Sequence, residues 1–580
     1  MKRSTLIAAL VGFSTALLLA VGFHHLTHHP LSSQTISSAP GSSTAQNQSA
    51  PASRVSETRY GTNLSRVSDW STQIPFIDGF KSSRTWVAQC DDSEPDCRGE
   101  WSTGEEDQLD LDQYGWVRSL PAVDDAPEYS RVGTLILGVD DYLGGTYLVL
   151  YDGEGKLEYS LDARQRTEES QPGRDVLEVT PQGNGIHLQI VETNPDNYIR
   201  NIRVVPAEYE EAIEQEPFNP VFLEKTKPFA VLRFMDWMDT NDSEQGEWAN
   251  RPKPDDATYA NYGVPVEVMV DLANRLERSP WFNMPHQATD DYVSNFAQYV
   301  QQHLNPDLPV YVELSNEVWN GQFDQEEYAI EQGRQQISGR EDDTAKGYLW
   351  YGKRTAEVLQ IWDQVFEGDR DRVVGILGAQ SANPWTAETS LEYLRSNGIS
   401  NAQAGIDAVA IAPYIGLSLS DDSVEQDLER WIEAGQAVAL DRLFEELTVG
   451  GALADGHPGG ALQRTFDWVT DYVDLVASEG LGLVAYEGGQ HLAPLHNGME
   501  NNEAIADFFI AANRDPRMGE VYRLYLSRWR DEVGDLFVHF SDVSNPGKWG
   551  SWGALESIYQ DGSPKYDALL EAITATRPVS

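Results

Sequence analysis

The stretch VYVELSNEVWN, residues 310–320, combines two features that decide the expected fold. Its first five residues are mostly apolar and rich in β-branched and aromatic side chains, which is typical of a buried strand. Polar side chains follow at once and lead to Glu317. A buried strand with polar residues directly after its carboxyl end is typical of parallel barrels, in which that end forms the functional rim.

Similar apolar runs recur along the chain, each followed by polar or aromatic residues and then by a helical stretch. From residue 229 onward the seven runs are 229–235, 281–284, 310–314, 373–377, 408–412, 483–486 and 536–540. Helical periodicity fills the intervals, for example at 264–277, 290–304, 343–367, 423–447, 463–479 and 502–531. This alternation predicts a parallel sheet wrapped by helices, and we assign residues 218–575 to it.

Seven strands are one fewer than a closed (β/α)8 barrel needs. We expect the missing first strand at Tyr60–Leu64, in a segment of residues 58–115 that also supplies the loops after it. Residues 131–205 differ, because strands alternate there with turn signals such as the hairpin sequence that starts at Asp152. We therefore predict an α/β fold, a (β/α)8 TIM barrel in which residues 116–210 form a small inserted antiparallel β-sandwich. The alternative is that this β-sandwich is a separate domain in series with the barrel.

A second glutamate lies at the corresponding position, directly after another strand. The segment VAYEGG, residues 484–489, ends the seventh strand and contains Glu487. Strands four and seven lie across a barrel from each other, so we expect the two glutamates to face one another at the C-terminal rim. Cleavage of a glycosidic bond needs two such carboxyl groups, which a retaining enzyme holds roughly 5–5.5 Å apart.

These motifs resemble the large clan of retaining glycosidases, clan A, in which Asn-Glu follows strand four and Glu follows strand seven. The resemblance covers residues 58–90 and 218–575, and it points to a relative of cellulases, mannanases and xylosidases. It implies that Glu317 is the general acid/base, that Glu487 is the nucleophile and that Asn316 holds the 2-hydroxyl group of the sugar. The implied reaction is hydrolysis of O-glycosidic bonds, β-configured, in a neutral poly- or oligosaccharide. A transglycosylase and a non-catalytic carbohydrate-binding or scaffold protein are the alternatives.

Further residues are candidates for contact with the nucleophile or the substrate. The resemblance implies an arginine and a tyrosine bound to the nucleophile, sugar contacts at the end of strand three, and a tryptophan on the rim of strand eight. Two tryptophans near other strand ends are candidates for stacking on sugar rings, with core packing as the alternative. The arginine is Arg233 and the tyrosine is Tyr414. The sugar contacts of strand three are Asn283 and His286, and the tryptophan of strand eight is Trp549 or Trp552. The two further tryptophans are Trp237 and Trp319.

Composition narrows the class of partner. The 580 residues include 92 acidic and 42 basic side chains, for a formal net charge of −50. Such a surface repels phosphate backbones, which argues against nucleic acid and favours a neutral carbohydrate substrate. The strand ends show neither His-x-His patterns nor clustered carboxylates, so we expect neither a metal nor another cofactor.

The start of the chain is typical of an export signal. The basic residues of MKR precede a continuous apolar run at residues 6–23. We expect residues 1–23 to be a signal peptide or a membrane anchor, followed by a flexible Ser-rich linker at 24–57. The protein is then extracytoplasmic, secreted or tethered, and reaches the membrane only through an uncleaved segment. Cys90 and Cys97 are either a disulfide or two free thiols.

Overall fold

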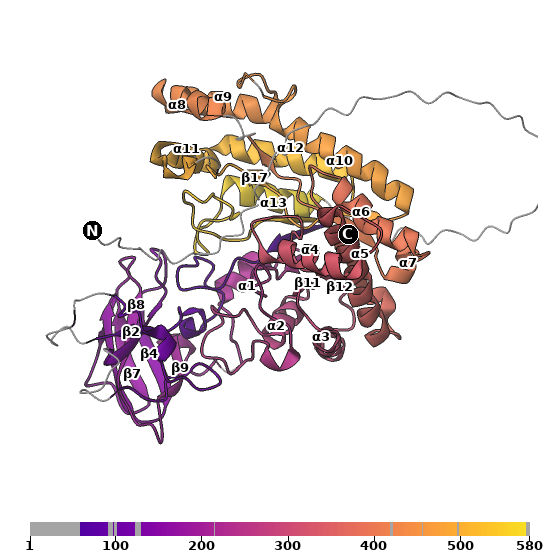
Figure 1. Ribbon diagram of the computed structural model, residues 1–580. Coiled ribbons are helices and arrows are strands. Elements are labelled where there is room, and N and C mark those ends of the chain that lie inside the picture. The colour runs from indigo at the N-terminus through magenta and orange to yellow at the C-terminus, as the bar shows by residue number, and fades with distance from the viewer. Residues whose placement is uncertain are drawn as a thin grey trace, which may run out of the picture.

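The computed structural model describes residues 59–90, 97, 101–121, 129–213, 215–417, 422–454, 456–495 and 498–575. The expected signal or anchor segment and the expected linker lie outside these residues. Within the described part of the chain, none of the helices combines the length and the apolar character that crossing a membrane requires. Figure 1 shows the strands between residues 87 and 206 gathered at one side of a larger helical body.

Eight parallel strands close into a barrel. In barrel order they are β1 (Tyr60–Asn63), β10 (Val231–Arg233), β11 (Ser279–Met284), β12 (Val310–Leu314), β13 (Val373–Gly378), β14 (Ala408–Ile411), β16 (Gly482–Ala485) and β18 (Phe537–His539). Pairing of Tyr60 with Phe537 closes the ring between the first and last strands. The predicted barrel is confirmed, with the strand at Tyr60 as its first member.

Helices separate successive barrel strands and form the outer layer (Figure 1). They are α1 (Pro220–Thr226), α2 (Val266–Leu276), α3 (Asp290–His303), α4 (Asp324–Gln336), α5 (Asp343–Val365), α6 (Trp385–Ser396), α7 (Asn401–Ala404), α8 (Asp422–Glu433), α9 (Gln436–Thr448), α10 (Gly460–Glu479), α11 (Glu503–Arg514), α12 (Pro516–Glu532) and α13 (Pro564–Ala575).

Two helices expected to be continuous are each divided. The helix expected at 423–447 is α8 and α9, because Gly435 between them has a φ of +107°, which a helix cannot contain. The helix expected at 502–531 is α11 and α12. Asp515 is extended and caps α12, and Pro516 opens that helix at the position where proline needs no hydrogen-bond donor.

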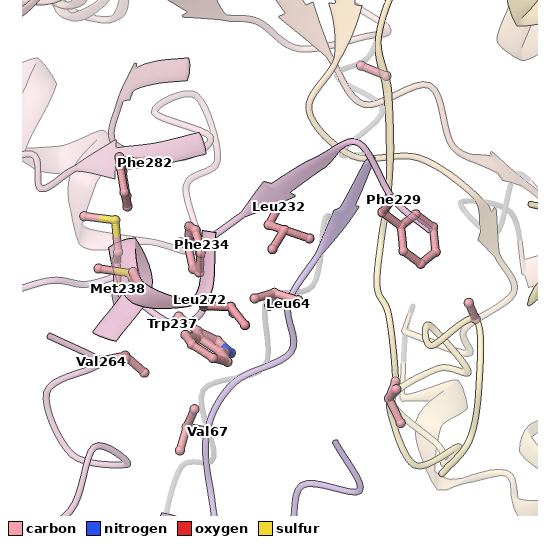
Figure 2. Close-up of a cluster of buried hydrophobic side chains, with 14 of the residues drawn as sticks. Leu64, Val67, Phe229, Leu232, Phe234, Trp237, Met238, Val264, Leu272 and Phe282 are labelled. Carbon is pink, nitrogen blue, oxygen red and sulfur yellow. The ribbon is translucent and has the colours of Figure 1, made fainter. Parts of the chain in front are cut away.

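The barrel strands are buried on both faces, which explains their nearly continuous apolar sequences. Ten buried apolar residues fill the interior: Val231, Trp281, Tyr311, Ile376, Ala408, Ala410, Val484, Tyr486, Leu536 and Val538. Outside the strands, a second and much larger cluster packs between sheet and helices. Figure 2 shows its part around Trp237, where Leu64, Leu232, Phe234 and Phe282 meet residues of the following loops.

Two four-stranded antiparallel sheets lie between β1 and β10 in the sequence. One has the order β2 (Val87–Gln89), β3 (Arg131–Ile136), β8 (Ile186–Thr193) and β5 (Gly155–Leu161). The other has the order β6 (Ala163–Gln165), β7 (Arg174–Val179), β4 (Gly145–Asp152) and β9 (Arg200–Pro206). The first sheet begins earlier than residue 116, because β2 pairs with β3.

Backbone contacts join these sheets to the segment that follows β1. The amide of Gly138 donates to the carbonyl oxygen of Asp69 at 2.7 Å. The carboxylate of Asp78 accepts from the amides of Phe80 and Val204. Buried apolar residues of the sheets and of the barrel also belong to one continuous cluster. The sheets are therefore packed against the loops of the first barrel strand.

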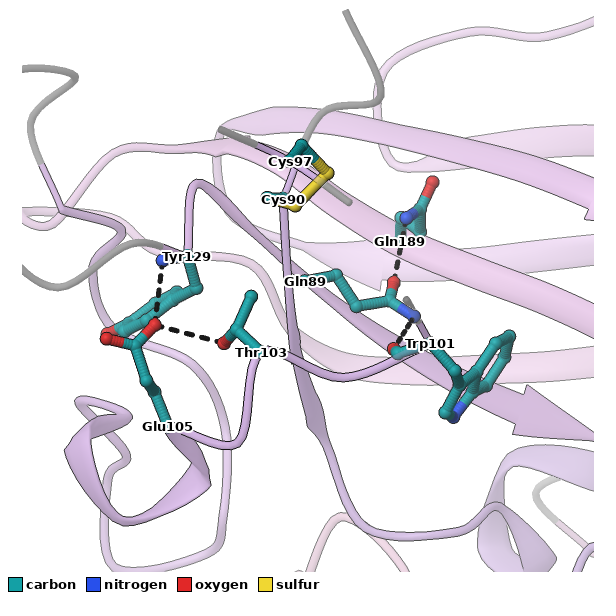
Figure 3. The surroundings of a disulfide bond; sticks show 8 residues. All are labelled: Gln89, Cys90, Cys97, Trp101, Thr103, Glu105, Tyr129 and Gln189. Atoms are coloured by element: carbon teal, nitrogen blue, oxygen red, sulfur yellow. Dashed lines mark hydrogen bonds between the residues drawn. A yellow bond between two sulfur atoms is a disulfide. The ribbon is translucent and has the colours of Figure 1, made fainter. Parts of the chain in front are cut away.

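Cys90 and Cys97 form a disulfide, with Cα atoms 5.7 Å apart (Figure 3). The bridge lies directly after β2. The neighbouring side chain of Gln89 donates to the carbonyl oxygen of Trp101 at 2.9 Å and accepts from Gln189 at 2.7 Å. The disulfide thus closes a loop at the point where the chain leaves the sheet.

Candidate active site

Glu317 and Glu487 follow the carboxyl ends of β12 and β16, as the sequence predicts. The turn after β12 is unusual, since Ser315 and Glu317 have φ values of +58° and +41°. Residues other than glycine rarely adopt this left-handed conformation, and it is enriched at functional sites. Both glutamates are largely buried, with 6% and 3% of their surface exposed.

Glu487 is held by a cation and a hydroxyl group. Arg233 donates from Nη1 to Oε1 of Glu487 at 2.9 Å. Tyr414 donates from its hydroxyl group to Oε2 at 2.9 Å. These are the two partners that the resemblance assigns to the residue at this position. Each carboxylate oxygen therefore has a donor, and one of the donors is charged.

Glu317 is held by two neutral donors. The hydroxyl group of Tyr486 donates to Oε1 at 2.9 Å, and the side-chain amide of Asn320 donates to Oε2 at 2.9 Å. Tyr486 immediately precedes Glu487 in the sequence. One short segment therefore supplies one glutamate and positions the other.

The surroundings of the two glutamates separate their charge states. Burial raises the pKa of both carboxyl groups, because the ionised form loses hydration. The charge of Arg233 opposes this effect at both glutamates, but of the two only Glu487 forms a hydrogen bond with it, and the charge of Glu317 raises the pKa of Glu487 further. The two groups therefore titrate as a pair. Hydrogen bonds from a charged donor are about twice as strong as neutral ones, so the arrangement favours the negative charge on Glu487 and the proton on Glu317.

Arg233 is fully buried and joins four side chains. Besides Glu487, Nη1 donates to Oδ1 of Asn63 at 3.1 Å, and Nη2 donates to Oδ1 of Asn316 at 2.9 Å. Asn316 in turn donates to Oδ1 of Asn241 at 3.1 Å. Asn316 is thereby fixed beside Glu317.

Glu313, within β12, is a further buried carboxylate and the fourth partner of Arg233. Its Oε2 accepts from Arg233 at 2.9 Å, from Trp281 at 2.9 Å and from Asn283 at 2.8 Å. Asn283 also donates to the carbonyl oxygen of Ser315 at 2.8 Å, and its side chain has no exposed surface. The donors of Asn283 are thus bound inside the barrel, whereas its Oδ1 atom has no partner among the described residues, and its contact with the sugar stays a prediction.

His286 is buried in a pocket of aromatic and amide groups. Its ring lies edge-on to Tyr328, with centroids 5.1 Å apart, and its Nε2 lies 3.3 Å from the side-chain nitrogen of Gln287. Burial lowers the pKa of His286 to about 4, so the imidazole is neutral at physiological pH. Among the described residues, no hydrogen bond joins it to Glu317 or Glu487, and its contact with the sugar stays a prediction.

Trp237 does not line the site. Its ring is completely buried, and its indole nitrogen donates to the carbonyl oxygen of Ser65 at 3.1 Å and to the side chain of Gln73 at 3.2 Å. Figure 2 shows it among the aliphatic and aromatic side chains of the outer core. This corrects the expectation of stacking on a sugar, because no face of the ring is open.

The two tryptophans after β18 have different surroundings. Trp552 is buried and lies edge-on to Tyr414, the partner of Glu487, with ring centroids 5.9 Å apart. Trp549 is 40% exposed, and its carbonyl oxygen accepts from the indole of Trp552 at 2.9 Å. Trp319 is half-buried, with its ring centroid 6.3 Å from that of Tyr486. Trp552 and Trp319 thus lie next to the tyrosines that bind the two glutamates.

Four residues around the site were not among those that the sequence predicts: Asn63, Glu313, Asn320 and Tyr486. The sequence contains a feature that could have identified Glu313, since it is the only charged residue in the strand VYVEL. The same holds for Tyr486, because it directly precedes Glu487. Nothing in the local sequence indicates Asn63, which lies 170 positions from Arg233.

Metal ligands are not grouped in the described part of the chain. No set of three or more His, Cys, Asp and Glu side chains among the described residues is placed to hold a metal ion.

Comparison with solved structures gives matches of low identity and low TM-score. No protein-family model matches the sequence, and no curated protein matches it. A 4-O-α-L-rhamnosyl-β-D-glucuronidase from Fusarium oxysporum 12S is 11% identical, with a TM-score of 0.33, over 60% of this chain and 61% of that one. A xylanase from Cellvibrio japonicus in complex with xylopentaose is 10% identical, with a TM-score of 0.34, over 77% and 92%. A GH5 cellulase described as Bacteroidetes-affiliated is 11% identical, with a TM-score of 0.31, over 62% and 84%.

Proposed function

We propose that this protein is a retaining glycoside hydrolase, with Glu487 as nucleophile and Glu317 as general acid/base. One observation carries the proposal. Two buried carboxyl groups follow β12 and β16 of a closed barrel, and one is bound by a guanidinium while the other is bound by neutral donors. Retaining glycosidases need this division between an ionised and a protonated carboxyl group.

In the first step, Glu317 transfers its proton to the glycosidic oxygen as the bond from that oxygen to the anomeric carbon breaks. The carboxylate of Glu487 attacks the same carbon and forms a covalent glycosyl ester. In the second step, ionised Glu317 takes a proton from water. The resulting hydroxide displaces Glu487, and the sugar leaves with its original anomeric configuration.

The neighbouring side chains have supporting roles in this proposal. Arg233 and Tyr414 keep the nucleophile ionised and oriented through their bonds to its two oxygens. Asn316 holds the 2-hydroxyl group of the sugar, and its amide nitrogen retains a second hydrogen for that contact besides the one given to Asn241. Trp552 provides an aromatic surface beside Tyr414.

We infer that the substrate is a neutral poly- or oligosaccharide with β linkages. The net charge of −50 disfavours anionic polymers. The disulfide between Cys90 and Cys97 supports an extracytoplasmic location, where such bonds persist. The apolar run at residues 6–23 is consistent with export of the chain by a cleaved signal or a retained anchor.

The test is incubation of the full-length protein with a panel of neutral β-glucans, β-mannans, β-xylans and β-galactans. Proton NMR at early times identifies the anomer released first. We expect β product from at least one polymer and none with Glu487→Gln, whose fold is checked by thermal unfolding. Release of the α anomer would show an inverting enzyme. Equal release by Glu487→Gln would remove that residue from the chemistry.

A further inference from the structure

A cavity lies away from the glutamate pair, between the end of α11, the loop after β18 and the start of α13. Its volume is about 270 Å³, close to the lower end of small-molecule sites, which begin at roughly 300 Å³. Its polar lining includes Asn513, Arg514, Ser544, Ser551, Glu556 and Lys565. The space suits a molecule of monosaccharide size.

Several polar atoms around this cavity lack partners. Lys565 is 4% exposed, and its Nζ donates to the carbonyl oxygen of Ser551 at 2.5 Å, although an ammonium group can donate three hydrogen bonds. The Oδ1 atom of Asn513 and the Oγ atom of Ser551 are buried and have no hydrogen-bond partner among the described residues. Buried polar groups are nearly always hydrogen-bonded, so a molecule that pairs with these atoms would remove an energetic cost.

The charges lining the cavity do not balance. Arg514 and Glu556 form a bidentate ion pair with distances of 2.7 and 2.8 Å, which compensates both. Lys565 forms no ion pair with any described residue, and its one hydrogen bond is to a neutral carbonyl oxygen. When Lys565 is protonated, the lining therefore carries one uncompensated positive charge, in a protein whose formal net charge is −50. An anion is the complementary ligand.

We propose that this cavity binds a small carboxylate that also carries hydroxyl groups, such as a sugar acid. The carboxylate pairs with Lys565 and accepts from the hydroxyl group of Ser551. A ligand hydroxyl group donates to Oδ1 of Asn513. Much of inorganic phosphate is dianionic at neutral pH and would bring a second negative charge towards Glu556. The hydroxylated carboxylate satisfies each unpartnered atom with a single negative charge.

The cavity is separate from the proposed catalytic residues, but a hydrogen-bonded carbonyl group connects its lining to the segment that carries Glu487. The carbonyl oxygen of Ser551, which accepts from Lys565, also accepts from the side chain of Gln490 at 2.8 Å. Gln490 lies three residues after Glu487, and Ser551 precedes Trp552. The proposed ligand therefore lies behind the loop that carries Trp552. This inference does not depend on the proposed hydrolase activity.

The charge of Lys565 gives the binding a pH dependence. Burial lowers the pKa of Lys565 to about 7, and the nearby Glu556 opposes that shift. His539 also lies near, but burial lowers its pKa to about 3, so it adds no charge. A bound carboxylate favours the ammonium form. Affinity is therefore expected to fall as pH rises from 6 to 9.

The experiment is isothermal titration calorimetry of the full-length protein with sodium gluconate, compared with sorbitol, acetate and inorganic phosphate. We expect gluconate to bind at one site, at least about tenfold tighter than each comparator. Lys565→Met should weaken gluconate binding by about tenfold or more, and Ser551→Ala by about threefold. The matched control is Lys548→Met, which replaces an exposed lysine of the loop that carries Ser551 and should leave the affinity unchanged.

Three outcomes would overturn the proposal. The first is that gluconate binds no more tightly than sorbitol or acetate. The second is that folded Lys565→Met binds gluconate with unchanged affinity. The third is that Glu487→Gln loses gluconate binding while Lys565→Met keeps it. The last result would place gluconate at the glutamate pair. If Lys565→Met does not fold, the Ser551→Ala variant and the pH series test the proposal instead. An affinity for gluconate that changes neither in Ser551→Ala nor with pH would overturn the proposal.

Discussion

Arg233 places one positive charge against two carboxylates, those of Glu313 and Glu487. An unpaired buried charge is costly, and removing one partner of such a pair destabilises a protein by roughly 3–5 kcal/mol. Glu313 therefore holds the guanidinium in place while Glu487 shares it. The balance matters for the proposed chemistry, because the guanidinium must stabilise the nucleophile and still release it when the ester forms.

Replacing Glu487 by glycine should remove the nucleophile and leave space beside Arg233 and Tyr414. We expect turnover to fall by at least about a thousandfold. Sodium azide should then restore cleavage of an activated aryl glycoside and give a glycosyl azide of inverted configuration, measured by NMR. Wild-type turnover in this variant without azide would contradict the role of Glu487.

Replacing Glu317 by glutamine keeps the size of the side chain but removes its proton donor. Substrates with poor leaving groups should lose about a hundredfold or more in the glycosylation step, while activated aryl glycosides should lose far less. Burial raises the pKa of Glu317, and the proposed acid acts only when protonated. Wild-type kcat/KM should therefore fall as pH rises through that pKa, and this limb should vanish in Glu317→Gln. An equal loss on both substrate classes would count against the assignment.

At the scale of elements, the disulfide closes a short loop at the end of β2. Cys90 and Cys97 are separated by seven positions. Chain-entropy reasoning gives about 2 kcal/mol for a loop of this length, through restriction of the unfolded chain. The bridge belongs to the antiparallel sheets and does not contact the glutamate pair.

The double variant Cys90→Ser/Cys97→Ser should therefore loosen the sheet and spare the barrel. We expect faster amide hydrogen exchange in β2 and β3, with kcat/KM on an activated substrate within about twofold of wild type. A reducing agent should reproduce this effect in the wild type and add nothing in the double variant. Unchanged exchange in β2 would show that the bridge is dispensable for the sheet.

At the scale of the whole molecule, charge and core act in opposite directions. Buried apolar residues of the sheets and the barrel belong to one cluster, which favours the compact state. The formal net charge of −50 opposes it through self-repulsion. Salt shortens the Debye length from about 30 Å at 0.01 M to about 3 Å at 1 M, so it weakens only the repulsion between exposed charges.

Thermal stability should consequently rise with sodium chloride between 0.01 and 1 M, by several degrees in Tm. Differential scanning fluorimetry measures the shift, with sorbitol at matched osmolality as the control for effects of water activity. A Tm that falls, or that rises equally in sorbitol, would show that self-repulsion is not what limits stability.

The sequence alone determined the barrel strands and the two glutamates. Burial on both faces of a strand produces a continuous apolar run, and the polar residues after it mark the rim, so local pattern suffices for both. It also indicated Arg233, as the single cation in an apolar strand, although its partners were implied only by resemblance.

Only the tertiary structure decided which side chains serve the site and which serve the core. Trp237 and Trp552 both follow barrel strands, yet the first is sealed in the outer core and the second lies beside Tyr414. Asn63 and Glu487 reach the same guanidinium across 170 and 254 positions of sequence. Closure of the barrel creates these contacts, and burial depends on neighbours distant in the chain, so no local pattern records them.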